Sequence, residues 1–469
     1  MNLPNYFLAD LPPEAELSPA MIRSACETLK RNREKYLQPR PTDDMVKVLC
    51  EVGAAWRQPE NRFRKLALEH GPAAAKFSRP VIERGLDAFF RQFTAENFQA
   101  LLLQDLGGGV AIMGGGNQSP VDSAVKPHAS RLPFWRGPEF LVHVAAGNIP
   151  NPALMSMTLG LLTRSAQFIK CASGAALLPR LFAHMIYEAD HKLGACLELA
   201  EWSGGNVDLE NVLFSEADCV TATGADKTLE AVQSRLPAKV RFLGYGQRVS
   251  FGYVAREVLR DETVAELVSR AADDVIAWDQ NGCLSPHCFY VEERGAVESD
   301  KFAALLAAEL MQRADVEPRG DITIESSADI ASRRAMYETL AAHRGDVKLW
   351  QSQNSTAWTV VFEHEVRFRF SPLSRFIFVK PVPDVAAALR GLDEVQGKVS
   401  TVGLAAPTDR MHDLARQFAR WGATRICPPG QMQNPPLTWR HDGRPPLGDL
   451  VTWTDFETEP RMNTDKHGW

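Results

Sequence analysis

The sequence lacks several features that define whole classes of protein. No apolar run approaches the ~20 residues needed to span a bilayer, and the first residues do not follow the charged-then-apolar order of a signal peptide. Basic residues (52) do not outnumber acidic ones (58), and no basic patch is interleaved with aromatic residues. A membrane-spanning, secreted or nucleic-acid-binding protein is therefore not expected.

Cysteine is present but unpatterned. The eight cysteines are scattered without a CxxC pair, which argues against a disulfide framework or a zinc site and predicts reduced thiols in a cytoplasmic protein that holds no metal. The remaining composition is that of an ordinary globular protein, with 45% hydrophobic and 23% charged residues. A chain of 469 residues is long enough for two or three domains and a large core.

The first hundred residues carry apolar side chains at helical spacing. Ser18 followed by Pro19 predicts the start of a helix that runs to about residue 37, because serine caps helices and proline suits the first helical position. Further helices are expected from Thr42 and at residues 62–68, 80–93 and 95–106.

Two glycine triplets follow, at residues 107–109 and 114–116. They suggest a phosphate-binding loop, but no Gly-Lys-Ser/Thr follows them and no helical pattern begins there. A hairpin or a flexible connector fits this stretch better than a nucleotide site.

Between residues 140 and 254 short apolar runs alternate with helical patterns. We expect strands at residues 140–145, 167–171, 196–200, 219–223 and 240–243, and helices at 151–162, 177–193 and 226–236. Strands separated by helices of this length predict a parallel, doubly wound α/β sheet. Such a sheet binds ligands at the carboxyl ends of its strands.

The alternation continues less regularly to about residue 430. We expect helices at residues 262–276, 300–312 and 329–343, and strands at 288–291, 358–362 and 376–379. Residues 449–456 read as a final strand, because apolar and polar side chains alternate from Val451. A terminal strand outside the core pattern often pairs with another subunit.

Cys283 draws attention through its position after a polar turn and before an apolar strand. The preceding Gly282 allows the backbone to come close to a substrate, although a lone cysteine more often fills apolar space. The loops at other strand ends add to the pattern. They contain Gly147-Asn148-Ile149-Pro150, Lys170, Thr223-Gly224 and Gly244-Tyr245-Gly246.

In this order, these residues resemble the aldehyde dehydrogenase superfamily. That family has an Asn-x-Pro after its first Rossmann strand, a Lys after the second, a Thr-Gly-Ser opening a later helix and a nucleophilic Cys. Phe370-Ser371-Pro372-Leu373 is similar to its Ile-Phe-Gly-Pro stretch, and Arg440-His441-Asp442-Gly443 to its Pro-Phe-Gly-Gly turn. More closely, residues 80–460 resemble the long-chain acyl-CoA reductases of the bacterial bioluminescence type.

The resemblance implies an α/β, aldehyde-dehydrogenase-like fold in four parts. Residues 1–105 would form a helical part packed on the cofactor domain, and residues 106–254 the Rossmann-like NAD(P)-binding domain. Residues 255–430 would form the catalytic α/β domain with the nucleophilic Cys. Residues 431–469 would return to the cofactor domain and end in a small oligomerisation arm, so a homo-oligomer is expected.

The resemblance also assigns roles. Cys283 would be the nucleophile, and the Asn148 amide and the Cys283 N–H would hold the oxyanion. Lys170 would bind the cofactor ribose, while Thr223 and Gly224 would open the helix that faces the pyrophosphate. The plainer alternatives are a helix N-cap for Asn148, a surface lysine for Lys170 and a simple turn for Thr223-Gly224.

His287 follows Cys283 by four residues. On an extended strand it would lie ~13 Å away, so a structural role is favoured over tuning of the thiolate.

Three departures from the family pattern matter. Phe242 stands where hydrolytic relatives carry the Glu that activates water, so hydrolysis of an acyl-enzyme should be slow. Ser173 replaces a Glu of NAD-preferring relatives, which leaves room for a 2′-phosphate and predicts NADPH, with NADH as the alternative. Phe368-Arg369 replace the ribose-binding Glu; Arg369 or Arg367 could touch the cofactor, but a solvated strand face is favoured.

Together these expectations describe an NADPH-dependent reductase that converts an acyl thioester, either a fatty acyl-CoA or an acyl-protein, to the aldehyde through an acyl-Cys283 intermediate. Its expected partners are an acyl-protein synthetase or a carrier protein. The alternatives are an aldehyde dehydrogenase that makes acids or acyl-CoA with NAD(P)+, and a non-catalytic scaffold for an acyl-protein synthetase.

Overall fold

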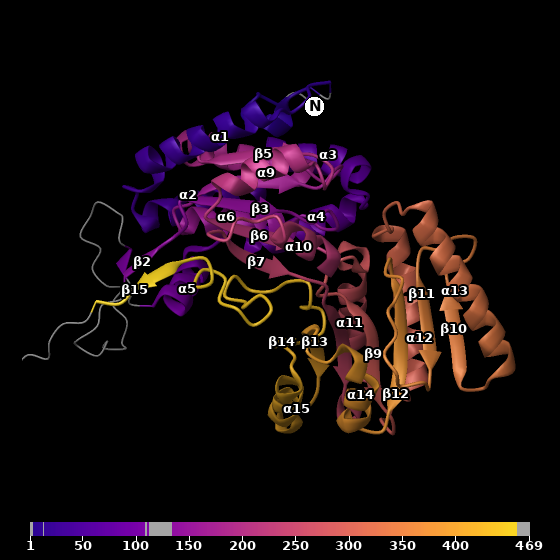
Figure 1. Ribbon diagram of the computed structural model, residues 1–469. Helices are drawn as coiled ribbons and strands as arrows, with labels where there is room; N and C mark the ends of the chain where they lie inside the picture. The colour runs from indigo at the N-terminus through magenta and orange to yellow at the C-terminus, as the bar shows by residue number, and fades with distance from the viewer. Residues whose placement is uncertain (1–2, 13, 108–109, 112–133, 457–469) are drawn as a thin grey trace, which may run out of the picture.

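The computed structural model describes residues 3–12, 14–107, 110–111 and 134–456 (Figure 1). The second glycine triplet and residues 108 and 109 lie outside this part, so the connector predicted there is not described. The described chain contains three β-sheets, of five, seven and three strands. Figure 1 shows the five-stranded sheet and its helices in one half of the molecule and the seven-stranded sheet in the other.

The first sheet is entirely parallel, with the order β5-β4-β3-β6-β7. Its strands are β3 (Phe140–Val144), β4 (Ala166–Cys171), β5 (Leu197–Glu201), β6 (Cys219–Thr223) and β7 (Arg241–Tyr245). All five were expected from the sequence. The chain adds β4 and β5 on one side of β3 and then returns to add β6 and β7 on the other. Ligands of such sheets bind where the strand order reverses, here between the carboxyl ends of β3 and β6.

Helices cover both faces of this sheet and bury apolar side chains against it. One face packs against α1 (Pro19–Asn32), α9 (Val207–Glu216) and α10 (Asp226–Gln233). The other packs against α6 (Asn151–Leu162) and α7 (Leu177–Ala189). The same core continues into α2 (Thr42–Trp56), α3 (Arg62–Ala75), α4 (Arg79–Arg91) and α5 (Ala95–Leu106).

Two helix boundaries show how local residues determine where a helix begins or ends. The Ser18 side chain accepts a hydrogen bond from the Met21 N–H, with Pro19 in the first turn, as the sequence predicted. The helix expected over residues 177–193 is instead divided at Asp190. This residue has extended backbone and caps the short helix α8 (His191–Gly194) through the amides of Lys192 and Leu193.

The seven-stranded sheet has the order β10-β11-β12-β9-β8-β13-β14, and only the edge strand β10 is antiparallel. Its strands are β8 (Val249–Val254), β9 (Pro286–Glu292), β10 (Val347–Gln351), β11 (Thr359–Glu363), β12 (Phe376–Val382), β13 (Val399–Ala405) and β14 (Arg425–Cys427). One face packs on α11 (Val264–Ile276) and α12 (Ser299–Val316). The other packs on α13 (Ile324–His343), α14 (Val385–Gly391) and α15 (Thr408–Trp421).

Strand β8 corrects the domain boundary expected at residue 254. Its residues were placed with the cofactor domain, but β8 pairs with β9 and β13 in the seven-stranded sheet. All six of its residues are buried, as in a central parallel strand of either sheet. Burial alone therefore does not reveal which sheet such a strand joins.

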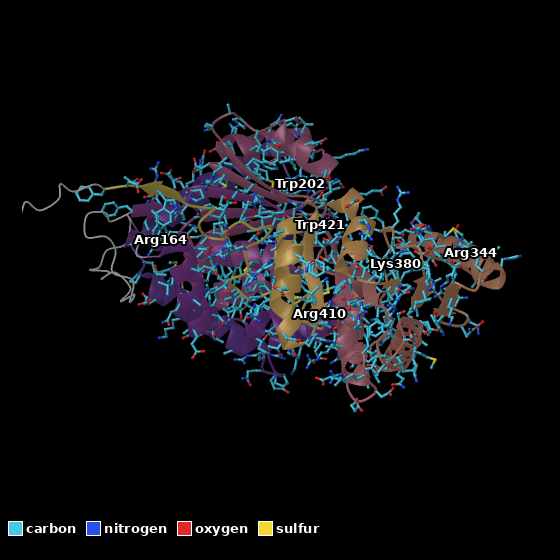
Figure 2. All side chains as sticks on the ribbon, turned by 90° about the horizontal axis from the view of Figure 1, so that it is seen from below. Arg164, Trp202, Arg344, Lys380, Arg410 and Trp421 are labelled. Atoms are coloured by element: carbon cyan, nitrogen blue, oxygen red, sulfur yellow. The ribbon has the colours of Figure 1, made fainter. Side chains whose placement is uncertain are left out.

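Buried charges join elements of the second half. Lys380 of β12 forms an ion pair with Glu363 of β11, and Arg410 of α15 binds Glu292 of β9 at 2.7 Å. Figure 2 shows Lys380 and Arg410 in this half and Trp202 among the elements of the five-stranded sheet.

The C-terminal segment returns to the first half. Strand β15 (Thr452–Thr454) pairs antiparallel with β2 (Phe134–Arg136), and β1 (Val110–Ala111) completes the three-stranded sheet. Figure 1 shows the yellow strand β15 beside β2. Leu437, Leu447 and Leu450 anchor the preceding segment in the core shared with α2–α7. A strand in this tail was expected, and its three side chains are exposed.

Two further observations concern the described chain as a whole. None of its helices combines the length and the apolar character that crossing a bilayer requires. All eight cysteines are free thiols.

Candidate active site

Cys283 lies in a short loop just before β9, and the loop is fixed from several sides. The Ser250 hydroxyl donates to the Cys283 carbonyl oxygen at 2.8 Å. The Gln433 side-chain amide donates to the Ser285 hydroxyl. A Cβ on Gly282 would lie 2.2 Å from Gln433 Nε2, so only glycine permits this approach. These contacts define the position of the sulfur-bearing residue.

Asn148 connects the two halves of the molecule at this loop. Its Nδ2 donates to the Asn281 carbonyl oxygen at 2.8 Å, two residues before Cys283. It does not cap α6, whose N-cap is Pro150 without a side-chain hydrogen bond. The structure therefore brings Asn148 and the Cys283 loop together, as the resemblance implied.

Asn148 and Cys283 border different cavities. Asn148 lines a cleft of about 260 Å³ together with Phe77 and Ser173. Cys283 opens into a second cavity of about 130 Å³, between α4, α6, the ends of β6 and β7, and the C-terminal segment. The walls of this second cavity are mostly apolar and include Phe89, Met155, Leu159, Leu437 and Leu450.

The cavity at Cys283 contains few titratable groups. Among its lining residues only Cys283, Tyr245 and His441 can gain or lose a proton near neutral or alkaline pH, and none is an aspartate or glutamate. Burial raises the pKa of Tyr245 to about 12. No lining carboxylate can therefore direct a water molecule at an intermediate on the sulfur.

Phe242 does not face Cys283. Its side chain packs with the core on the α9 and α10 face of the sheet, because neighbouring residues of a strand point to opposite faces. The β7 residue that lines the cavity is Tyr245. The expected lack of a carboxylate is therefore found at this wall, but it is Tyr245 rather than Phe242 that occupies it.

The Cys283 sulfur is a thiol rather than a thiolate at neutral pH. Burial raises its pKa to about 12, and the Asp442 carboxylate adds to the rise, while the N–H groups of Cys283 and Leu284 and the Arg248 guanidinium oppose it. Asp442 is itself paired with Arg248 at 3.2 Å. The chain alone therefore does not provide an environment that lowers the pKa of this thiol.

Lys170 stands at the carboxyl end of β4 and is 6% exposed. Its ammonium group lies 5.9 Å from the centre of the Trp202 ring. Burial lowers its pKa, and the Glu210 and Glu201 carboxylates oppose this effect. Glu210, whose charge opposes this effect most, is itself paired with Arg235. A buried ammonium group with open donors fits the hydroxyl groups of a ribose, and the surface-lysine alternative does not match its burial.

Ser173 is exposed two residues beyond β4, and its hydroxyl lies 3.1 Å from that of Ser203. The next residue, Gly174, donates its N–H to Glu201 Oε1 at 2.6 Å. Glu201 ends the neighbouring strand β5. Ser173 carries no charge, but the Glu201 carboxylate at the end of the adjacent strand places a negative charge beside this turn. The sequence spacing does not reveal this relationship.

Thr223 ends β6 and lines the Cys283 cavity. Gly224 follows it and donates its N–H to the Tyr245 carbonyl oxygen at 3.2 Å. Helix α10 begins at Asp226, and its N-cap Ala225 provides no side-chain acceptor. The first N–H groups of α10 therefore have no side-chain cap and can face an anion. The Asp226 carboxylate beside them is already bound to the Gln247 N–H at 2.9 Å.

His287 has a structural environment. Its Nδ1 accepts the Ser371 N–H at 3.1 Å, and its ring packs edge-on against Phe368 and Phe370. It does not line the Cys283 cavity. The stretch that resembles the Ile-Phe-Gly-Pro motif is thus packed on β9 through His287.

The two arginines near this stretch have protein partners. Arg367 pairs with Glu394 on the surface, and Arg369 lies 3.7 Å from Glu363. The strand face expected for both is wrong, because β11 ends at Glu363 and β12 begins at Phe376. Both arginines are exposed in the connecting segment, and their carboxylate partners give no support to a cofactor contact.

Comparison with known proteins places the chain in a family. A model of the family described as acyl-CoA reductase (LuxC) matches residues 37–453. Long-chain acyl-protein thioester reductase 2 of Photobacterium leiognathi is 24% identical over 331 residues, which cover 69% of this chain and 65% of that protein. The long-chain acyl-protein thioester reductase of Aliivibrio fischeri is 23% identical over 322 residues, covering 67% and 63%. The chain thus spans slightly less than two thirds of the length of these relatives.

Solved structures identify the fold. A NAD-dependent benzaldehyde dehydrogenase from Corynebacterium glutamicum superimposes with a TM-score of 0.67 and 13% identity, covering 97% of this chain and 94% of that one. This likeness confirms the aldehyde-dehydrogenase-like fold that the sequence predicted.

Proposed function

The chain belongs to the acyl-CoA reductase (LuxC) family, and on that premise we propose that it reduces an acyl thioester to an aldehyde through a covalent acyl intermediate on Cys283. The cavity at Cys283 is the observation that carries this proposal. Its walls are mostly apolar, which suits an acyl chain, and they include no carboxylate. Without a lining carboxylate to activate water, the acyl group is protected from hydrolysis.

Acyl transfer begins when the Cys283 sulfur attacks the thioester carbonyl carbon. The new carbon–sulfur bond forms as the old one breaks, and the donor leaves as a free thiol. The N–H groups of Cys283 and Leu284 face the sulfur and favour negative charge there. We assign the Cys283 N–H and the Asn148 amide as oxyanion donors, since Asn148 uses one N–H for Asn281 and retains a second.

A reductase family of this fold implies a nicotinamide cofactor, which would supply the hydride when bound. We propose that Lys170 binds its ribose hydroxyls, that Ser173 borders the 2′ position, and that Thr223 and Gly224 lead to the helix start that faces its pyrophosphate. NADPH is the proposed form because Ser173 is uncharged. The nearby Glu201 carboxylate reduces this preference, so NADH is the second choice.

The substrate and partners follow from the relatives. They are named long-chain acyl-protein thioester reductases, so we propose a long-chain acyl group delivered on CoA or on a protein. An acyl-protein synthetase or a carrier protein would be the donor, in a cytoplasmic setting that keeps the cysteines reduced.

We also propose that the two halves of the chain have different roles. The helical N-terminal part and the five-stranded sheet would bind the cofactor, and the seven-stranded sheet from β8 onward would carry the nucleophile. The exposed edge strand β15 would pair with a second copy in a homo-oligomer.

Intact-mass measurement with a panel of acyl-CoAs tests the proposal. We expect a mass increase of one acyl group in the wild type, none in Cys283→Ser, and an unchanged adduct in Cys427→Ser, whose thiol is also half-buried. Adding NADPH should discharge the adduct and release aldehyde.

Two outcomes would reject it. Absence of an adduct with every chain, combined with wild-type function of Cys283→Ser in a reconstituted complex, would indicate a scaffold. Oxidation of aldehyde to free acid faster than reduction of acyl-CoA would indicate an aldehyde dehydrogenase.

A further inference from the structure

We propose that His441 is the proton carrier for acyl transfer at Cys283: its imidazole takes the proton of the attacking thiol and gives it to the departing thiolate. This inference rests on the proposed function and adds a catalytic residue to it. The need for a carrier arises because the half-buried Cys283, whose pKa is raised to about 12, is protonated at neutral pH. A thiol must lose its proton as it becomes the nucleophile.

His441 is the base that the cavity offers. It lines the same cavity as Cys283, although 158 positions separate them in the chain. The other titratable wall residue, Tyr245, stays protonated because burial raises its pKa to about 12. A protonated phenol cannot accept a proton. Among the lining residues, the imidazole is therefore the group that can serve as a base.

The orientation of the imidazole is set by stacking on both sides. The Tyr245 ring lies parallel to it at 4.2 Å between centroids, and the Trp439 ring lies at 4.6 Å. The Arg444 guanidinium covers the outer face of Tyr245 at 4.3 Å and donates to the Gly244 carbonyl oxygen at 2.8 Å. These contacts hold the imidazole in a wall of the cavity that it shares with Cys283.

The turn that carries His441 is equally constrained. Asp442 and Gly443 have φ values of 52° and 79°, and the Arg444 N–H closes the turn on the His441 carbonyl oxygen at 3.0 Å. The Asp442 carboxylate is fixed by Arg248 at 3.2 Å. The ring is thus held by its own turn as well as by its stacking partners.

The ring nitrogens are open. No side chain or backbone group within the described residues makes a hydrogen bond to either nitrogen of His441, whereas His143 and His287 each use theirs in protein contacts. Burial lowers the pKa of His441 to about 4, so the ring is neutral at neutral pH. A neutral imidazole has one accepting and one donating nitrogen, which is the state that a proton carrier requires.

The proton balance closes without a further reactant. The enzyme thiol and the acyl thioester become the acyl-enzyme and a free thiol, and the proton moves from Cys283 to His441 and then to the leaving sulfur. The imidazole does not hold the proton at equilibrium, because its lowered pKa of about 4 lies below that of Cys283; it passes the proton from the attacking sulfur to the leaving one, which is also a thiol. Water, with a pKa of about 15.7, is a much poorer proton donor to the same base. The carrier therefore favours thiol exchange over hydrolysis.

The test compares variants that keep or remove the nitrogens. His441→Phe retains an aromatic ring in the stack, and His441→Gln retains polarity without a base. His412→Gln is the matched control, because His412 is exposed on α15. Stopped-flow detection of released CoA thiol gives the acylation rate, and intact mass confirms the adduct on Cys283. We expect His441→Phe and His441→Gln to acylate roughly 10²-fold more slowly with acyl-CoA, and the control to match the wild type.

A second donor separates proton transfer from a structural effect. An aryl thioester expels a far more acidic thiol, which needs no proton to leave, although Cys283 must still lose its own proton. The loss in both variants should therefore be smaller with this donor than with acyl-CoA, without disappearing. Equal losses with the two donors, or an unchanged rate in His441→Phe, would overturn the proposal. Acylation of the wild type in the same experiment shows separately whether the proposed function itself holds.

Discussion

Arg375 and Asp279 form an ion pair, and their side chains are only 2% and 3% exposed. Asp279 lies four residues before Cys283. Arg375 Nε donates to Asp279 Oδ1 at 2.8 Å. Each residue lies in a run of three non-glycine residues with left-handed backbone, residues 278–280 and 373–375. Such backbone costs about 1–2 kcal/mol per residue, so contacts between the two runs must hold them in place. The ion pair joins the nucleophile loop to the stretch that resembles the Ile-Phe-Gly-Pro motif.

Removing one partner of this pair should destabilise the protein strongly. We expect Arg375→Met to lower the free energy of unfolding by about 3–5 kcal/mol, because it leaves the Asp279 carboxylate buried without its cation. Urea unfolding measures the difference. Arg416→Met is the control, since Arg416 forms an exposed pair with Asp413 on α15 and should unfold like the wild type. Equal midpoints for both variants would show that the buried pair does not hold the loop.

The Glu292 cluster should make stability depend on acid pH. Burial alone would raise the pKa of Glu292, but hydrogen bonds from Arg410, Tyr253 and Arg256 outweigh it and lower the pKa to about 2, from 4.5. A lowered folded-state pKa contributes stability above pH ~4.5 that is lost as the pH falls toward 2. We therefore expect the gap in unfolding free energy between the wild type and Glu292→Gln to be largest above pH 5 and to narrow toward pH 2. A gap that stays constant over this range would contradict the assignment.

The sequence predicted the five-stranded sheet well because each of its strands is a short apolar run between clear helical patterns. It did not predict the sheet membership of β8, since a strand buried on both faces has the same pattern in either sheet. It also gave no sign of β13 or β14. Strand β13 pairs with β8, which is distant in the chain, and β14 pairs with β13, which was itself not recognised.

Prediction of the candidate site from the sequence has the same limit for individual side chains. Cys283 drew attention because it follows a polar turn, and Asn148 because its Asn-x-Pro resembles a family motif; the structure joins their loops. His441 and Glu201 could not be found, because their importance depends on neighbours from other segments. His441 meets Tyr245 across 196 positions, and Glu201 meets Gly174 across a pair of adjacent strands. The turn expected to precede the oligomerisation strand thus provides a wall of the cavity.

Glu201 should restrain the preference for NADPH. Its carboxylate lies beside the turn that would border a 2′-phosphate, and two like charges a few ångströms apart in water repel by about 1 kcal/mol. We expect Glu201→Gln to increase the affinity for NADPH roughly fivefold relative to NADH, measured by titration of the reduced cofactor's fluorescence. Glu27→Gln, on the exposed face of α1, should leave both affinities unchanged. A ratio that does not move in Glu201→Gln would place the 2′ position elsewhere.

The wall formed by α6 should set the acyl chain length. Ser156 lines the Cys283 cavity from this helix, so Ser156→Trp would fill space that a long chain needs while leaving the thiol accessible. We expect adduct formation with long acyl-CoAs to fall at least tenfold and with acetyl-CoA to fall less, since the short acyl group needs less of this space. Intact mass after timed incubation gives both rates. Lys227→Trp, exposed on α10, adds the same side chain away from the cavity and should leave both rates unchanged. Equal slowing of long and short chains by Ser156→Trp would contradict the proposal that this cavity holds the length of the acyl chain.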